Sequence, residues 1–344
     1  MKHVFIVHSH TLFLTSMGAI EYLHLNHKNV IFICTRNYDT SLTPVDCVKI
    51  RGEQMYKWSD EIYYSQDKKF IKSRLIYLDQ YLSELITDEY ELFVPHLSDP
   101  LFQLMYTHPM CTKVSYVQEG AYTINNFFIN SIPFFQKIKR RLWLMYRYGN
   151  TRFYCYLSAW YTDGMLHHQK TLDVYAVYEE SFKGLKCVSH IVSWPDYDKE
   201  LPIKISGPVF VFDGFVTNNQ ADQDYYLEKC RLLIKRYHQD HNLIKFHPAQ
   251  NKEERDDIIS MFKEINVSYQ EMDESIPFEL YIIRSKKMTV VGFGSSLLYY
   301  AQSRGHHVIC CDTWMMGDPK YKDYHDQGCP FFHDFFNIDR VTED

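Results

Sequence analysis

Short apolar runs alternate along the chain with longer stretches in which apolar positions recur every three or four residues. The short runs are rich in β-branched and aromatic residues, which is typical of buried parallel strands, and the longer spacing is typical of amphipathic helices. In the first half this pattern predicts strands at 2–9, 29–35, 90–97 and 112–120, with helices over about 11–26 and 69–86.

The second half repeats the alternation. Strands are predicted at 203–215, 242–249, 287–291 and 306–311, and helices at 224–240, 253–265, 275–285 and 295–304. Alternating strands and helices predict an α/β fold with doubly wound parallel sheets. Because 344 residues exceed the size of a single core, we expect two domains, separated by the Pro- and charge-rich stretch 193–204. The expected domains are 1–195 and 203–325, followed by a C-terminal tail over 326–344.

Composition narrows the class of protein. A net charge of −6 argues against general nucleic-acid binding, and nine scattered cysteines without a C-x-x-C pair indicate reduced thiols rather than disulfides or a zinc site. The start of the chain lacks the long apolar stretch of a signal peptide, and no segment reaches the length of a membrane span. We therefore expect a cytoplasmic protein. The many aromatic residues suit either sugar-facing surfaces or a core.

The charge is unevenly distributed. Residues 120–162 contain no acidic residue, and the segment 134–154 interleaves basic and aromatic side chains. Such a segment suits peripheral contact with the inner membrane, with aromatic rings at the level of the lipid headgroups. The alternative is an amphipathic helix whose aromatic face packs inward, which we favour because Trp143 and Leu144 need burial in either case.

The stretch VVGFGSSLL suggests a phosphate site. Gly292 and Gly294 allow a tight turn after a strand, and Ser295 and Ser296 open a helix whose free N–H groups favour an anion. The alternative is a serine cap with glycines that permit close packing. The stretch has neither the G-x-G-x-x-G fingerprint nor the Walker lysine, so neither NAD nor ATP is implied.

The stretch LIKFHPAQ ends a second strand of the same half. His247 is held there by the rigid Pro248, and Lys245 precedes it by two residues and shares its face of the strand. This histidine either meets the same phosphate and donates a proton as it departs, or belongs to a structural His-Pro turn. Glu279, one turn into a helix, suits a ribose diol, and the alternative is a surface glutamate at a helix start.

Two further strand ends carry carboxylates. Glu119 and Gly120 follow a strand of the first half, where a general base would meet an acceptor hydroxyl and the glycine would let a bulky substrate approach. Asp213 and Gly214 close a strand of the second half and are secondary candidates for lining a cleft between the two domains. The acidic pairs at 196–198 and 222–224 follow no apolar strand, and we interpret them as a loop and a helix start rather than metal ligands.

Taken together, these motifs resemble those of bacterial sialyltransferases of GT-B fold, the group of lipooligosaccharide sialyltransferases and capsule polysialyltransferases. An acidic-acidic-Gly motif, a His-Pro motif and a Ser-Ser motif follow one another in that group. Here they read Gln118-Glu119-Gly120, His247-Pro248 and Ser295-Ser296, and a Pro-x-Glu element is matched by 277–279. One departure is Gln118, which leaves Glu119 as the base.

The resemblance implies two Rossmann-like domains that face each other across a cleft, the first binding the acceptor and the second the nucleotide. It implies transfer, with inversion, of a nonulosonic acid from a CMP-sugar, usually CMP-N-acetylneuraminate, to a glycan hydroxyl of capsule or lipooligosaccharide. Glu119 would be the base, His247 would assist departure of CMP, Ser295 and Ser296 would hold the phosphate, and Glu279 the ribose. No cofactor and no metal would be needed, because His247 and helix N–H groups replace a cation.

Two other functions are compatible with the same His-Pro and Ser-Ser motifs of the second half. One is a different cytidine-nucleotide transferase that uses Kdo, pseudaminic or legionaminic acid, or a CDP-glycerol-type donor. The other is a non-catalytic scaffold for capsule assembly. The donor separates the first from a sialyltransferase, and burial of Glu119 or His247 inside a core would favour the second.

Overall fold

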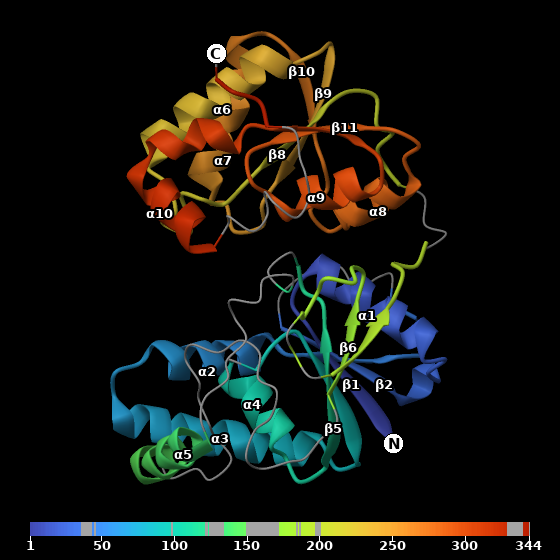
Figure 1. Cartoon of the computed structure of the whole chain (residues 1–344), viewed down its shortest axis with the longest axis vertical. Helices are drawn as coiled ribbons and strands as arrows, with labels where there is room; N and C mark the ends of the chain where they lie inside the picture. Colours follow the sequence, from blue (N-terminus) through green and yellow to red (C-terminus); the bar gives the residue numbers. More distant parts are fainter. Residues whose placement is uncertain are drawn as a thin grey trace. The chain divides into compact units, whose positions relative to one another are not determined.

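The computed structural model describes residues 1–35, 43–44, 46–97, 99–120, 123, 134–148, 172–183, 185, 187–196, 201–328 and 340–343. The chain divides into two compact units, unit 1 from Met1–Pro195 and unit 2 from Asp196–Asp344 (Figure 1). Most of the predicted tail 326–344 lies outside the described residues. Its residues 340–343 return to unit 2, where the Val341 N–H donates to the Cys310 carbonyl at 3.1 Å.

Unit 1 is built on a seven-stranded parallel sheet in the order β3-β2-β1-β4-β5-β6-β7. Its strands are β1 Lys2–Val7, β2 Val30–Cys34, β3 Val48–Arg51, β4 Tyr90–Val94, β5 Cys111–Val117, β6 Leu172–Ala176 and β7 Val188–Ile191. Its helices are α1 His10–Tyr22, α2 Glu53–Tyr64, α3 Lys68–Leu85, α4 Pro100–Tyr106 and α5 Phe134–Tyr148. A short 3-10 helix, His27–Asn29, precedes β2.

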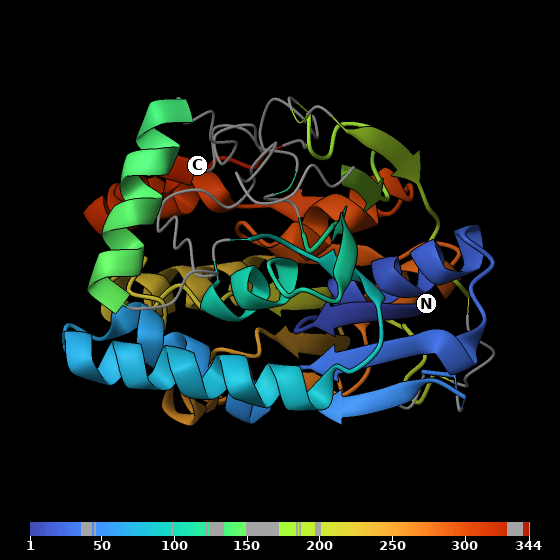
Figure 2. The same cartoon turned by 90° about the horizontal axis from the view of Figure 1, so that it is seen from below.

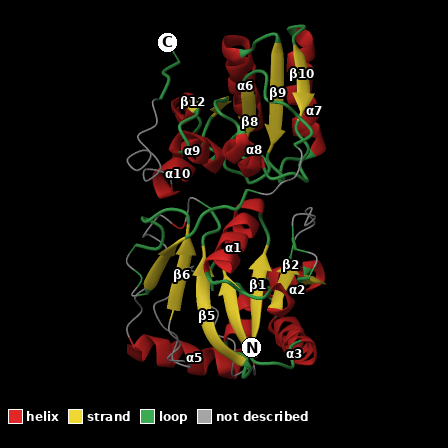
Figure 3. Ribbon diagram, turned by 90° about the vertical axis from the view of Figure 1, so that its right-hand side faces the viewer, coloured by secondary structure: helices red, strands yellow, loops and turns green. Residues whose placement is uncertain are grey.

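Alternation along β1 supplies both faces of this sheet. Val4 and Ile6 belong to the core formed with α2, α3 and α4, whereas Phe5 stacks on Phe93 at 4.1 Å between ring centroids. Helix α1 lies over β1 and its neighbouring strands (Figure 3). Helices on both faces bury every β1 side chain from Val4 to Val7. A strand buried on both faces reads as a continuous apolar run, which is the pattern that predicted it.

Unit 2 holds a five-stranded parallel sheet in the order β10-β9-β8-β11-β12. Its strands are β8 Val209–Phe212, β9 His241–Phe246, β10 Ser268–Glu271, β11 Thr289–Gly292 and β12 His307–Cys310. Its helices are α6 Gln223–Tyr237, α7 Lys252–Glu264, α8 Phe278–Arg284, α9 Ser296–Ser303 and α10 Pro319–Gly328, with a 3-10 helix at Asp312–Gly317. Phe210 and Phe212 pack with the buried side chains of α6 and α7.

Three local details differ from the sequence-based expectation. Helix α1 ends at Tyr22, because His24 adopts a left-handed backbone with φ 51° that cannot continue the helix. The helix predicted over 275–285 begins only at Phe278, with Pro277 as its N-cap. The interpretation of α5 with an inward aromatic face is wrong, because Phe135, Trp143 and Tyr146 are exposed. Residues 149–154 of that segment lie outside the described residues.

The described cysteines are free thiols, and no helix in the described ranges is both long and apolar enough to span a bilayer.

Gly18 determines how closely α1 approaches the segment that follows β7. A Cβ at this position would lie 2.3 Å from the Ser193 carbonyl oxygen, a backbone atom that moves only with the chain. We expect Gly18→Ala to lower the free energy of unfolding by about 1–3 kcal/mol, as overpacking does elsewhere. Chemical denaturation checks this against Glu21→Ala, an exposed position on the same helix. Equal stability of both variants and the native chain would contradict the close approach.

Candidate active site

Both sheets reverse their strand order once. The reversal lies between β1 and β4 in unit 1 and between β8 and β11 in unit 2. In open parallel sheets, ligands bind outside the carboxyl ends of the strands at such a reversal, because the connections on either side run to opposite faces. Each sequence-predicted motif can therefore be located relative to this edge.

In unit 1 the strand ends at this edge bring two histidines close to Glu119. His8 follows β1, His96 follows β4 and Glu119 follows β5. The His8 Nε2 atom lies 2.5 Å from the Glu119 Oε1 atom, and the His8 and His96 rings are 6.3 Å apart between centroids. His8 is buried, whereas the Glu119 side chain is 27% exposed. A carboxylate oriented by a buried imidazole and open on one side can take a proton from a bound hydroxyl.

Burial keeps His96 neutral. Burial lowers the pKa of this imidazole to about 4. The negative charge of Glu119 acts in the opposite direction, but its effect on the pKa is smaller than that of burial. At neutral pH the ring therefore contributes hydrogen bonds but no charge next to Glu119.

Gln118 has a structural role. Its side chain is fully buried, and its Oε1 atom accepts hydrogen bonds from the Val177 N–H at 2.8 Å and the Ser181 hydroxyl at 3.1 Å. These bonds tie the end of β5 to the loop after β6. The amide thus occupies the first acidic position of the motif without competing with Glu119, and Gly120 follows Glu119 directly.

In unit 2 His247 stands exposed at the end of β9 with its ring oriented by the backbone. The ring Nδ1 atom of His247 accepts a hydrogen bond from the Ala249 N–H at 3.1 Å. The backbone N–H of His247 donates to the Phe212 carbonyl and to the Gln250 side chain. A neutral ring that accepts at Nδ1 carries its hydrogen on Nε2. His247 therefore presents a donor, and the Pro248 turn that follows it is exposed as well.

The ends of β8 and β11 meet beside this histidine. A Cβ on Gly214 would lie 3.0 Å from the His247 Nδ1 atom, so a side chain at this position would crowd the ring. The Asp213 Oδ2 atom accepts the Gly294 N–H at 3.5 Å. Asp213, Gly214, His247 and Gly294 thus gather at one edge of the sheet, as their predicted strand ends required.

Of the two serines, Ser295 caps a helix and Ser296 begins it. The Ser295 oxygen accepts the Leu297 N–H at 3.4 Å as the N-cap of α9, and its hydroxyl also interacts with the Asp213 carboxyl. The capping alternative therefore describes Ser295, while Ser296 is partly exposed in the first turn of α9. The helix start still places N–H groups and a positive dipole end at this edge.

Lys245 and Glu279, in contrast to the exposed His247, are buried within unit 2. Lys245 is buried, and no described residue accepts a hydrogen bond from its Nζ atom. Burial lowers the pKa of this amine, and Glu279 on α8 is the acidic group that most opposes the shift. A buried ammonium group without a hydrogen-bond partner is costly, which favours a ligand atom that would accept from it.

The Asp213 carboxyl is 6% exposed, and burial raises its pKa to about 7 despite hydrogen bonds from Gly294 and Ser295. The raised pKa means that the folded chain loses stability relative to Asp213→Asn as pH rises from about 4 to about 7. The slope is at most about 1.4 kcal/mol per pH unit. Denaturation of both proteins between pH 4 and 8 measures this difference. A difference that does not change with pH would show that Asp213 titrates normally.

Sequence reasoning missed His8 and His96. Both lie close to the carboxyl end of a predicted strand, which is the same signal that singled out His247. Applied uniformly, a search for titratable side chains at strand ends would have found them.

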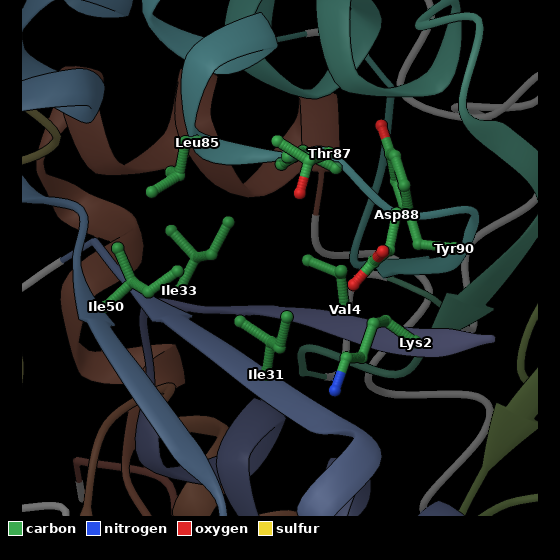
Figure 4. A pocket seen from close by; sticks show the side chains of 10 residues that line it. Lys2, Val4, Ile31, Ile33, Ile50, Leu85, Thr87, Asp88 and Tyr90 are labelled. Atoms are coloured by element: carbon green, nitrogen blue, oxygen red, sulfur yellow. The ribbon is translucent and has the colours of Figure 1, made fainter.

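A pocket in unit 1 lies between the sheet and the end of α3, and it does not carry this chemistry. Its lining is mostly aliphatic and contains none of the predicted site residues (Figure 4). The lining residues are Lys2, Val4, Ile31, Ile33, Ile50, Leu85, Ile86, Thr87, Asp88 and Tyr90. Within the described parts of the chain, no group of three or more His, Cys, Asp or Glu side chains could hold a metal ion.

Comparison with solved structures supports the fold. S. aureus MnaA, in a co-structure with UDP, superposes with a TM-score of 0.51 at 11% identity, covering 90% of this chain and 79% of that chain. The spinosyn rhamnosyltransferase SpnG, complexed with thymidine diphosphate, gives 0.48 at 11% identity over 98% and 92% of the two chains. A sialyltransferase from Photobacterium damsela gives 0.45 at 13% identity over 95% and 79%. The GT-B class, with two Rossmann-like domains, is confirmed.

Comparison of sequences finds one family model that matches part of the chain. Residues 155–311 match the family model of alpha-2,8-polysialyltransferases, and no curated protein matches the chain. The matched region contains the His-Pro and Ser-Ser motifs, whereas Glu119 lies outside it. The predicted resemblance to bacterial sialyltransferases is therefore confirmed over this region, which is less than half of the chain.

Proposed function

We propose that this protein transfers a sialic or related nonulosonic acid from a CMP-sugar to a hydroxyl of a bacterial surface glycan, capsule or lipooligosaccharide, with inversion and without a metal ion or other cofactor. The observation that carries the proposal is the gathering of Gly214, His247 and the α9 start at the order reversal of unit 2. These groups offer an exposed Nε2 donor and a helix N-terminus, which together suit a phosphate.

The proposed step breaks the bond between the sugar anomeric carbon and the phosphate oxygen, and forms a bond from that carbon to the acceptor oxygen. Glu119 takes the acceptor proton while His8 holds its carboxylate in place. His247 donates from Nε2 to the phosphate oxygen that leaves with CMP. Ser296 and the first N–H groups of α9 hold the remaining phosphate charge, and Lys245 with Glu279 binds the nucleoside.

Release of CMP from CMP-N-acetylneuraminate tests this proposal, measured in EDTA with and without a galactose-terminated acceptor. Acceptor-stimulated, EDTA-resistant release is the expected result. A parallel donor panel with CMP-Kdo, CMP-pseudaminic acid, CMP-legionaminic acid and CDP-glycerol decides the donor. Turnover of one of these in place of the sialic acid donor would reassign the substrate. CMP binding without release from any donor would contradict the catalytic proposal and favour a scaffold.

We also propose that the protein is cytoplasmic, because its CMP-sugar donor would be synthesised in the cytoplasm. Fractionation of cells that express the chain, with and without a high-salt wash, would test it.

A further inference from the structure

Exposed large hydrophobic side chains are concentrated on a few neighbouring helices of unit 1. Of the thirteen exposed in the described part of the chain, eight lie on α2, α3 and α5, and α5 packs against α3 (Figure 2). These eight are Tyr63, Tyr64, Ile76, Tyr77, Phe135, Leu142, Trp143 and Tyr146. Apolar side chains scattered singly over a surface need no explanation, but a concentration of them indicates a binding surface.

On α5 the described residues that are exposed, apart from Gln136 beside them, form one face. Phe135, Lys139, Leu142, Trp143 and Tyr146 follow one another at spacings of four, three, one and three residues, which keeps them within about 100° of arc at 100° per residue. We call these five residues the α5 face. Phe135 is 81% exposed, Leu142 60%, Trp143 49% and Tyr146 92%. Four large apolar side chains therefore point away from the core along the whole length of the helix.

The charge of α5 is opposite to that of the chain. Its fifteen residues contain Lys137, Lys139, Arg140, Arg141 and Arg147 and no acidic residue, while the chain as a whole carries −6. The neighbouring α3 begins with lysines that are exposed at 68, 69 and 72. A local excess of positive charge on an acidic protein indicates an anionic partner.

The kinds of exposed side chain distinguish between anionic partners. An anionic polysaccharide would be bound by cations and by rings that stack on sugars, but the aliphatic Leu142, which is 60% exposed, would stay in water. A bilayer accepts all of them, because leucine and phenylalanine enter the acyl boundary, tryptophan and tyrosine prefer the headgroup region, and lysine and arginine meet the lipid phosphates.

We propose that α5 docks on a bilayer that contains anionic lipid, with its axis in the membrane plane and the α5 face inserted among the headgroups. This proposal concerns a surface of unit 1 and does not rest on the proposed function.

Flotation of the full chain with vesicles tests the proposal. The vesicles contain either phosphatidylcholine alone or phosphatidylcholine with about 30% phosphatidylglycerol, a share near that of anionic membranes. We expect binding to the anionic vesicles that weakens with added salt. The double variant Phe135→Ser/Tyr146→Ser, which changes the two most exposed positions, should bind at least about tenfold more weakly.

The matched control is Val48→Ser/Val188→Ser, which removes two exposed hydrophobic side chains from the edge strands β3 and β7 of the same unit. It should bind as the native chain does, and circular dichroism checks that both variants are folded. Lack of binding to anionic vesicles, or equal loss in both variants, would overturn the proposal. A soluble polyanionic glycan that binds the native chain but binds the Phe135→Ser/Tyr146→Ser variant more weakly, without vesicle binding by either, would assign the helix to a glycan instead.

Discussion

Replacing Glu119 by glutamine should lower the rate of transfer by about 10²–10⁴-fold, the range that a general base contributes. Glutamine keeps the size of the side chain and a hydrogen bond to His8, but it cannot take the acceptor proton. The affinity for CMP should stay unchanged, because the residues proposed to bind the nucleotide belong to unit 2. Initial rates with the donor in excess measure the first effect, and calorimetric titration with CMP measures the second.

The control for this prediction is Glu179→Gln, an exposed glutamate of the same unit, which should transfer as the native chain does. Full activity of the Glu119 variant would remove Glu119 from the reaction. Equal loss of transfer and CMP affinity would indicate a damaged fold rather than a missing base.

Replacing His247 by alanine should lower both transfer and CMP affinity, the former by about 10²–10³-fold. The loss of affinity follows from the loss of the Nε2 donor, which the Ala249 N–H holds in place by its bond to Nδ1. His247→Gln separates the two roles, because its amide can still donate to the phosphate but cannot supply a proton. We expect this variant to recover CMP affinity more than rate.

His241→Ala is the matched control, because His241 is an exposed histidine at the opposite end of the same strand, β9. A His247→Ala variant that binds CMP normally and transfers at the native rate would return His247 to a structural His-Pro turn.

Much of the fold could be predicted because buried parallel strands carry an unambiguous pattern. The runs at 4–7 and 30–34 are apolar on both faces, and each proved to lie in a strand of the sheet. The short edge strand β3 carries no such signal, since Val48 and its neighbours are exposed or half-exposed. The end of α1 was missed because a left-handed residue such as His24 depends on the packing of the turn around it.

The candidate site could likewise be predicted only in part. Strand ends located Glu119, His247 and Asp213 correctly at the carboxyl edges of the sheets, since that placement follows from parallel topology alone. Contacts across the sheet could not be predicted. The pairing of His8 with Glu119 joins residues 111 positions apart. A serine cap was among the predicted alternatives, but which of the two serines is the cap depends on where α9 begins. Amphipathic spacing also cannot tell which face of α5 meets the core.

The central place of β1 in its sheet has a consequence for folding. β1 pairs with β2 on one side and β4 on the other, and His8 directly follows it. A slip of a single residue in this pairing would turn every β1 side chain to the opposite face and carry His8 away from Glu119. A misregistered chain would retain its helices and much of its compactness while losing the imidazole partner of Glu119. With Glu119 in its proposed role, specific activity in a refolded preparation would thus report the fraction of molecules whose strands have found their native alignment.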